Sequence, residues 1–260
     1  MASARRALIA GLGLIGGSIG IALRRRGWHV AYLDPNVSVD DARRAEAADD
    51  RADSFDYAAD LTILATPVGI AIDSLAQCRS LTTSVCSVMA PLRAAADAHR
   101  VAFVAGHPFA GSQERGLAAA RGDLFENASW FIDRDDPVVQ EVIAACDARA
   151  ELIDAAEHDR AVALTSHLPQ ILSTALAAHL HDQDVDPRFI GPGLRTFLRL
   201  AGSDASVWSS IIEANRENIA PHADAVAQLV RKMIEEEGGE EFAKANQWNK
   251  PFHAETRGTR

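Results

Sequence analysis

Short apolar runs alternate with amphipathic stretches between residue 7 and about residue 154. The runs are bounded by turn residues, as is typical of buried strands; they are ALIAG, HVAYLD, DLTILAT, TSVCSV, VAFVAG, SWFID and ELID. Helical patterns fall at 14–26, near 39–48, from 67, near 90–100 and from 137. Strands that alternate with helices of this length form βαβ units. The pattern therefore predicts a mostly parallel, doubly wound sheet.

From residue 157 onward the pattern changes to helices alone. The segment 157–180 is rich in Ala and Leu and apolar on more than one face, which predicts a buried helix, and Pro169 should kink it. Asp, Pro and Gly mark 182–193 as a linker. Further helices are expected at 194–202, 204–218 and 221–237.

The predicted fold class is α/β, with a Rossmann-like dinucleotide-binding domain followed by an all-α domain. We expect the first domain to cover 1–155 and the second to cover 156–248, with a polar and mobile tail at 249–260. A length of 260 residues and a hydrophobic content of 48% are sufficient for two domains with their own cores.

The net charge of −10 argues against a nucleic-acid surface. The basic cluster Arg24, Arg25 and Arg26 is better explained as the solvated last turn of a helix, where the helix dipole favours cations. Three cysteines stand far apart and form no CxxC pair, so neither a disulfide framework nor a zinc site is indicated. This cysteine usage fits a reducing compartment, and we expect a cytoplasmic protein.

Arg5 and Arg6, followed by ALIAGLGLIGGSIGIAL, resemble the charged and apolar regions of a secretory signal. However, this run carries five glycines at phosphate-loop spacing, is followed by three arginines and lacks a clear small-residue cleavage site. We therefore assign it to the fold. No other stretch approaches the roughly 18 uninterrupted apolar residues of a membrane span, so no membrane association is expected.

A glycine-rich turn follows the first strand and opens the first helix. Gly11, Gly13 and Gly16 have the spacing GxGxxG, in which successive glycines allow a tight turn, close approach of a pyrophosphate, and close packing of helix on strand. The helix N-terminus then faces the phosphates. With Leu14 and Ile15, these glycines are the expected cofactor-binding residues of the turn. The alternative is a glycine-rich turn with no ligand.

Asp34 ends the second strand, about 20 residues after the turn, where a carboxylate can bind both ribose hydroxyls and repel a 2′-phosphate. This favours NAD over NADP. Thr66 and Pro67 end the next strand and are expected to lie along the cofactor, although a proline there also suits an ordinary helix start.

His107 closes the apolar run 101–106 and opens the polar loop 107–116. Its imidazole is expected at the C-terminal edge of a buried strand, where open α/β sheets bind ligands. A base with a pKa near neutral beside a hydride acceptor describes an alcohol-oxidising enzyme. The alternative is a histidine that caps a helix or is buried for structural reasons.

Six segments in order, GLGLIGGS, LATPV, SVCSV, GHPFAGSQERG, EHDRAVALTSHLPQ and LRLAGSDASVW, resemble the prephenate and arogenate dehydrogenases of tyrosine biosynthesis. The resemblance covers residues 7 to about 220, and the HPFAG, SHLPQ and RLAGSD segments are its most specific parts. It implies oxidative decarboxylation of a cyclohexadienyl acid: hydride leaves the ring carbon that bears the 4-hydroxyl for NAD, the ring carboxylate departs as carbon dioxide, and the ring becomes aromatic.

The resemblance also implies roles for individual residues. His107 is the base at the hydroxyl with Ser87 as its neighbour, Arg199 binds a carboxylate, and Ser166 and Gln170 lie near the substrate. Each has another explanation: Ser87 as a small residue at a strand end, and Arg199 as an arginine that snorkels or pairs with Asp204. Ser166 and Gln170 share one helix face, from which His167 points about 100° away. His158 with Asp159 matches the family's HD pair, and a capping role explains that pair equally well.

Several positions depart from the family pattern. Gln170 stands where many relatives carry histidine, and Gln113 where some prephenate-using relatives carry glutamate. Cys86 and Met89 stand where relatives usually have glycine and lysine. Loss of a lysine removes a positive charge near a dianion, so arogenate or an amino-substituted prephenate remain candidate substrates beside prephenate.

Two other functions compete. A general hydroxy-acid dehydrogenase would usually place a catalytic lysine on its helical domain, but the only lysines, Lys232, Lys244 and Lys250, come very late. An NAD-sensing protein that has lost its chemistry would explain the departures from the family pattern. The helical half, with Trp208 and many alanines, is expected to form a homodimer, as the resemblance implies.

Overall fold

The computed structural model describes residues 4–111 and 114–255. The chain divides into two compact units, Met1–Arg216 and Glu217–Arg260. The first unit contains the sheets and the helices up to residue 214, and the second contains two helices. The domain boundary expected near residue 155 stays a prediction.

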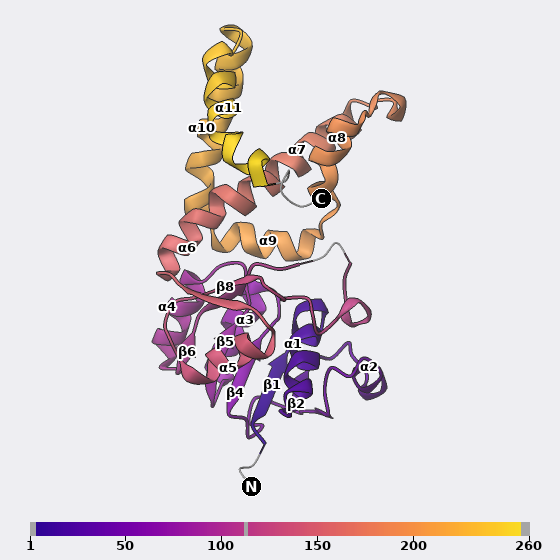
Figure 1. Ribbon diagram of the computed structural model, residues 1–260, viewed down its shortest axis with the longest axis vertical. Coiled ribbons are helices and arrows are strands. Elements are labelled where there is room, and N and C mark those ends of the chain that lie inside the picture. The colour runs from indigo at the N-terminus through magenta and orange to yellow at the C-terminus, as the bar shows by residue number, and fades with distance from the viewer. Residues whose placement is uncertain (1–3, 112–113, 256–260) are drawn as a thin grey trace. The chain divides into compact units, whose positions relative to one another are not determined.

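Six parallel strands form the main sheet of the first unit (Figure 1). They are β1 (Arg6–Ala10), β2 (His29–Leu33), β3 (Asp50–Arg51), β4 (Leu61–Leu64), β5 (Leu81–Ser84) and β6 (Phe103–Val104). Their order in the sheet is β3-β2-β1-β4-β5-β6. The doubly wound parallel sheet predicted from the sequence is confirmed. Because the winding reverses between β1 and β4, a ligand crevice is expected where these two strands end.

The helices between the strands of the first unit begin within one residue of the positions expected from the sequence. They are α1 (Leu14–Arg25), α2 (Val39–Arg44), α3 (Val68–Ser74), α4 (Ala90–His99) and α5 (Pro137–Ala145). Ser38 caps α2, and Asp136 caps α5 by accepting from the amides of Val138 and Val139. Arg24, in the last turn of α1, forms an ion pair with Asp49 at 2.9 Å, in keeping with a surface role for the basic cluster.

A second sheet departs from the sequence-based expectation. Its strands are β7 (Gly106–Pro108), β8 (Ser129–Ile132) and β9 (Arg149–Leu152), with β7 antiparallel to β8 and β8 parallel to β9. We expected these segments to continue the parallel sheet, but β6 ends at Val104 and the chain crosses into the second sheet. Gly106 permits the crossing, since a Cβ there would lie 2.7 Å from the carbonyl oxygen of Ser84.

Two expected strands are therefore shorter than their apolar runs. The run 101–106 is split between β6 and β7, so His107 lies on the second sheet. The run 83–88 was expected to be one strand, but β5 ends at Ser84, so Ser87 lies in the loop that leads into α4. Apolar composition alone does not show where a run leaves one sheet for another.

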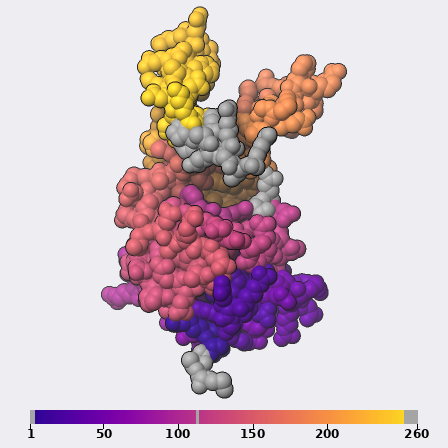
Figure 2. Space-filling model, viewed as in Figure 1, coloured from indigo at the N-terminus to yellow at the C-terminus, as the bar shows by residue number. Residues whose placement is uncertain are grey.

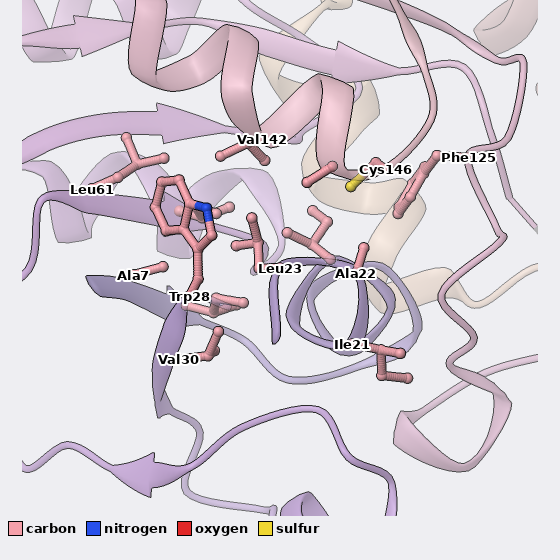
Figure 3. Close-up of a cluster of buried hydrophobic side chains, with 14 of the residues drawn as sticks. Ala7, Ile21, Ala22, Leu23, Trp28, Val30, Leu61, Phe125, Val142 and Cys146 are labelled. Carbon is pink, nitrogen blue, oxygen red and sulfur yellow. The ribbon is translucent and has the colours of Figure 1, made fainter. Parts of the chain in front are cut away.

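The main core fills the space between α1, α5 and the sheet (Figure 3). Leu23 of α1 is fully buried, and it packs with the indole of Trp28 and with Val142 of α5. Each such aliphatic side chain contributes about 1.5–3 kcal/mol when it is fully buried. This layer fixes α1 on the sheet and thereby fixes the glycine turn from which α1 begins.

Helices alone make up the remainder of the first unit. They are α6 (Ala155–Val162), α7 (Leu168–Asp182), α8 (Pro192–Phe197) and α9 (Ala205–Ala214), with short turns at Pro187–Phe189 and Leu198–Gly202. A π-helical turn, Ala163–His167, joins α6 to α7. It lies directly before Pro169, where we expected a kink, and it adapts the helix to a residue that has no amide hydrogen.

The second unit consists of most of α10 (Arg216–Glu235) and of α11 (Gly239–Glu255). The two helices meet at a turn in which Gly238 has φ +61°, and Lys232 of α10 bonds to Glu241 of α11 at 2.8 Å. We expected a tail at 249–260, but residues 249–255 belong to α11. Pro221 lies inside α10 and does not end a helix, contrary to the expected break before it.

One helical stretch, Ala155–Asp182, is long and apolar enough to cross a membrane by length and composition. It covers α6, the π-helical turn and α7. The buried Asp159 on this stretch accepts hydrogen bonds from two backbone amides at the start of α4. Only 33% of the most apolar window in this stretch is buried, so the stretch is less buried than the sequence predicted.

Candidate active site

The glycine turn between β1 and α1 has the shape of a phosphate cradle. Gly11 has φ +90°, and a Cβ there would lie 2.6 Å from the carbonyl oxygen of Ala65. A Cβ at Gly16 would lie 2.0 Å from the carbonyl oxygen of Gly11. In contrast, nothing lies within 4 Å of a Cβ built on Gly13. Gly11 and Gly16 thus stand where a side chain would clash with the backbone, whereas Gly13 leaves the turn open to a ligand.

A cavity of about 600 Å³ adjoins this turn and is lined by Gly13, Asp34 and Arg44, among others. Asp34 accepts hydrogen bonds from the amides of Leu12 and Asn36, each at 2.9 Å, which hold its carboxylate in place. Arg44 is the cation among the described residues that line the cavity, and it is paired with Asp41 at 2.8 Å. Hydrogen bonds from Ser38 and Arg44 lower the pKa of Asp41, so this pair stays ionised.

Thr66 follows β4, on the other side of the point where the strand order reverses. Within residues 4–111 and 114–255, the buried hydroxyl of Thr66 has no hydrogen-bond partner. Pro67 is exposed and is the N-cap of α3. The unpartnered hydroxyl of Thr66, the open glycine turn and the fixed carboxylate of Asp34 lie near one another. A dinucleotide fits this combination because it carries both hydroxyl and phosphate groups.

A second cavity, of about 1260 Å³, contains several of the expected site residues. Its walls include Leu14 and Ile15 from the start of α1, Ser87 from the loop after β5, and Gln170 and Arg199 from the helices. Gly116 lines both this cavity and the one at Asp34. The two cavities therefore adjoin at Gly116, and the start of α1 lines the one that contains Ser87 and Arg199.

His107 belongs to a chain of hydrogen bonds that leads into the protein. Its Nδ1 lies 2.9 Å from Nε2 of His158, and Nδ1 of His158 lies 2.8 Å from the carboxylate of Asp159. Asp159 in turn accepts from the amides of Met89 at 2.8 Å and Ala90 at 2.9 Å. Asp159 therefore caps α4, whereas Asp154 caps its own helix α6. The HD pair thus does more than the capping of its own helix.

Burial and a neighbouring His158 lower the pKa of His107 to about 3, and His167 contributes in the same direction. The ring is half-buried, and Phe109 packs on it edge to face at 4.9 Å. This pKa is well below the near-neutral value expected from the sequence, because burial disfavours the charged ring. His107 therefore stays neutral near pH 7 and keeps a lone pair on one nitrogen. It does not line either of the two cavities described above, so its contact with a substrate stays a prediction.

His167 points into the protein, away from the face that carries Ser166 and Gln170. Its Nδ1 lies 3.0 Å from the side-chain nitrogen Nδ2 of Asn215. The same nitrogen also donates to the backbone carbonyl oxygen of Asp159. Burial lowers the pKa of His167 to about 4, with the charge of Asp159 acting against this shift. Ser166 is half-buried.

The side chain of Gln170 differs from the expectation of a substrate contact. Its Nε2 donates to the carbonyl oxygen of Leu200 at 2.7 Å and to the hydroxyl of Thr174 at 3.1 Å. Its Oε1 accepts from the hydroxyl of Ser203 at 3.1 Å. These bonds tie the turn that carries Arg199 to α7, and they occupy both ends of the amide. Although Gln170 lines the cavity, its polar atoms are already hydrogen-bonded to other residues of the protein.

Arg199 is exposed and makes no ion pair in the part of the chain that the structure describes. The alternative pairing with Asp204 is not formed, because Asp204 pairs with Arg115 at 2.8 Å. Arg115 also donates to the carbonyl oxygen of Gly202. The guanidinium of Arg199 is thus available to an anion in the larger cavity, whereas Arg115 holds the loop after it.

The other departures from the family pattern do not change the cavity walls. The side chains of Cys86 and Met89 are buried in an apolar cluster. Burial raises the pKa of Cys86 to about 12, so it is a neutral thiol. Gln113, expected near the substrate, lies outside the described residues.

The sequence did not single out Asn215 or Arg115, and Trp208 was noted only in connection with the expected homodimer. Trp208 lines the larger cavity and packs against His167 at 5.8 Å. Their partners are remote in sequence, and no motif spacing connects them. The segment LRLAGSDASVW, which contains Asp204 and Trp208, was the available signal.

A doubly wound parallel sheet with an open glycine turn and a fixed acid, followed by helices, defines the class of protein: a nucleotide-binding α/β domain followed by a helical domain. A profile of the prephenate dehydrogenase nucleotide-binding domain matches residues 19–151, and a profile of the prephenate dehydrogenase dimerization domain matches residues 154–247. The chain belongs to the prephenate dehydrogenase family, as the sequence resemblance implied, and it is a dehydrogenase.

Relatives agree with this assignment. The prephenate dehydrogenase of Bacillus subtilis is 31% identical over 90% of this chain and 71% of its own length. That of Lactococcus lactis is 28% identical over 88% of this chain and 72% of its own. The crystal structure of prephenate dehydrogenase from A. aeolicus, in complex with hydroxyphenyl propionate and NAD+, matches with a TM-score of 0.84, 25% identity, and coverage of 98% of this chain and 99% of that one.

Proposed function

We propose that this protein catalyses the NAD-dependent oxidative decarboxylation of prephenate or arogenate. The observation that carries the proposal is that the cavity at Asp34 and the cavity at Ser87 and Arg199 share Gly116 in their walls. A dinucleotide laid on the glycine turn, with its adenosine ribose at Asp34, would extend its nicotinamide end toward Ser87 and Arg199. A ring acid in the larger cavity then lies within reach of it.

NAD is the cofactor that the residues fit. Asp34, held by two backbone amides, suits the two hydroxyls of an adenosine ribose, and Arg44 is already paired and so does not offer a free charge to a 2′-phosphate. The related structure from A. aeolicus was solved with NAD+, which supports the same cofactor here. Bound NAD supplies a hydride acceptor.

The protein's own residues have modest tasks, because aromatisation of the ring supplies driving force. The lone pair of neutral His107 accepts the proton of the ring hydroxyl, and Ser87 donates or accepts a hydrogen bond beside it. Arg199 binds a substrate carboxylate through its planar donors, and Ser166 lies on the same side. Holding the ring in one orientation converts the encounter into a unimolecular step.

The side-chain end of the substrate decides between prephenate and arogenate. Prephenate has a keto group there and arogenate has an ammonium group. Gln170, the neutral residue expected near this end, is engaged with Leu200 and Ser203 and offers no carboxylate to an ammonium group. The curated relatives from B. subtilis and L. lactis are both prephenate dehydrogenases. We therefore place prephenate first and arogenate second.

The direct experiment incubates purified protein with NAD+ and, in separate reactions, prephenate, arogenate and simple hydroxy acids. The absorbance of reduced nicotinamide and the release of carbon dioxide are both followed. Prephenate should give equal amounts of both products. Reduction with hydroxy acids alone would indicate a general dehydrogenase, and reduction with none of these would favour a nucleotide-sensing protein.

We also infer that the protein is a cytoplasmic homodimer that pairs through its helical domain. The profile matched to residues 154–247 describes a dimerization domain. Apolar side chains are exposed on the helices of this region, including Phe189 at 79% and Phe197 at 48%. The arm formed by α7 and α8 is visible in orange in Figure 2. Light scattering of the purified protein should give twice the monomer mass of 27.9 kDa.

A further inference from the structure

His158 lies behind the proposed base and lines neither of the two cavities described above. We propose that His158 is a positioning residue that holds His107 in the tautomer with its proton on Nδ1 and its lone pair on Nε2. This inference rests on the proposed function for its consequence, namely that the lone pair receives the hydroxyl proton of the substrate.

The direction of the hydrogen bonds follows from the carboxylate at the end of the chain. Asp159 accepts from the amides of Met89 and Ala90, and an ionised carboxylate can only accept. Nδ1 of His158, at 2.8 Å from this carboxylate, must therefore carry a hydrogen. A neutral His158 then has its lone pair on Nε2.

The same reasoning fixes the next ring. Nε2 of His158 lies 2.9 Å from Nδ1 of His107. Because the lone pair is on His158, the hydrogen between the two rings belongs to His107. A neutral His107 with Nδ1–H has a bare Nε2, which is the atom that a proton-accepting base must present.

Packing keeps the two imidazoles in this arrangement. His158 is 1% exposed and Asp159 is 1% exposed, so water does not compete for their hydrogen bonds. Phe131 packs on His158 at 5.8 Å, and Phe109 packs on both His107 and Phe131 at 4.9 Å. The carboxylate is held by the amides at the N-terminus of α4, where the helix dipole favours a negative charge.

A protonated His158 would reverse the effect. It would donate from Nε2 to Nδ1 of His107, and the hydrogen of His107 would then reside on Nε2, where it blocks the base. The groups that face the two rings are Asp159 on α6, His167 on the π-helical turn, and the aromatic rings of Phe109 and Phe131.

The first test measures the tautomer without any substrate. Nitrogen-15 chemical shifts of the imidazoles are recorded near pH 7, and the signals of His107 are identified by their loss in His107→Asn. We expect a protonated Nδ1 and a bare Nε2 for His107. A protonated Nε2 in the wild-type protein would overturn the proposal, whatever the activity of the enzyme.

The second test compares two substitutions at the same position. His158→Leu removes the acceptor, so turnover with the ring acid should fall by roughly 100-fold while KM and NAD+ affinity change little. In His158→Gln, the amide oxygen can still accept from Nδ1 of His107, so the tautomer and most of the turnover should return. Equal turnover for His158→Leu and the wild type would contradict the proposal, as would equal losses in both variants.

Phe131→Leu is the matched control, because Phe131 packs on His158 but has no polar atom in its side chain. It should lower the thermal stability and leave the Nδ1–H signal of His107 in place. Loss of that signal in Phe131→Leu would mean that packing, and not the acceptor on His158, sets the tautomer. Should His158→Leu fail to fold, the wild-type spectrum and His158→Gln still decide the question. A wild-type protein that shows the expected tautomer but reduces no NAD+ would refute the proposed function alone.

Discussion

The glycine turn and the histidine chain are built in different ways. The turn is local: its geometry comes from three glycines within six residues and from the strand and helix on either side. The histidine chain brings together Met89, His107 and Asp159 from three separate segments. In the proposed function, the turn would offer backbone amides to a cofactor shared by many enzymes, whereas the chain would prepare one side chain for one reaction. Cofactor binding at the turn would therefore be common to many enzymes, whereas the role of the histidines would be specific to this reaction.

The sharpest way to separate the two regions is His107→Asn. Turnover should fall by roughly 100-fold or more, because the proton acceptor is removed, while NAD+ affinity barely changes. Steady-state kinetics and titration of NAD+ measure the two quantities. Unaltered turnover would exclude His107 as the base.

Arg199→Gln tests the substrate side of the larger cavity. Loss of a charged donor to a carboxylate costs about 1.5–3 kcal/mol, so KM for the ring acid should rise by roughly 10- to 100-fold. Arg195→Gln, an exposed arginine on α8, is the control and should leave KM near the wild-type value. If both variants behave alike, Arg199 does not bind the substrate.

Lowering the pH should reduce the stability of the region around His107 and His167 before it affects the glycine turn. The pKa values of His107 and His167 are lowered from 6.5 to about 3 and about 4. The unfolded chain therefore binds more protons below pH 6.5, and the free energy of unfolding falls as the pH drops from 6.5 toward 4. Each histidine contributes a loss of about 1.5 kcal/mol between pH 6.5 and pH 5, so a total loss of about 3 kcal/mol is expected.

Urea unfolding at several pH values measures this loss. His167→Asn should flatten the dependence, whereas His181→Asn, at an exposed histidine, should leave it unchanged. A stability that is constant between pH 6.5 and 5 would show that these histidines are not held neutral.

Asp34→Ala is expected to have the smallest effect. Removing the carboxylate takes away a ribose contact and the repulsion of a 2′-phosphate, so the affinity for NADP+ relative to NAD+ should rise by roughly 10-fold. Competition binding of the two cofactors measures the ratio. A ratio equal to that of the wild type would remove Asp34 from the ribose site.

Much of the nucleotide-binding region could be predicted from the sequence, because its signals are local. The strands β1, β2 and β4, the helix α1 and the position of Asp34 follow from periodicity and from motif spacing. The second sheet could not be predicted in this way, since the run 101–106 gives no sign that the chain changes sheets at Gly106. The steric reason, a close approach to Ser84, comes from another strand.

The candidate site was predictable residue by residue but not as a network. His107 and His158 were both noted, yet their hydrogen bond depends on how α6 docks beside β7. Gln170 was expected to face the substrate because of its place in a motif, but its amide bonds to residues about 30 positions later. Residues 249–255 of α11 were expected to belong to a tail because their polar composition gives no core-facing stripe.

The most direct test of the enzyme assignment uses prephenate that carries deuterium on the ring carbon bearing the hydroxyl. With NAD+ and this protein, the label should appear in the reduced nicotinamide, one equivalent for each carbon dioxide released. Carbon dioxide without labelled cofactor, or labelled cofactor without carbon dioxide, would contradict an oxidative decarboxylation.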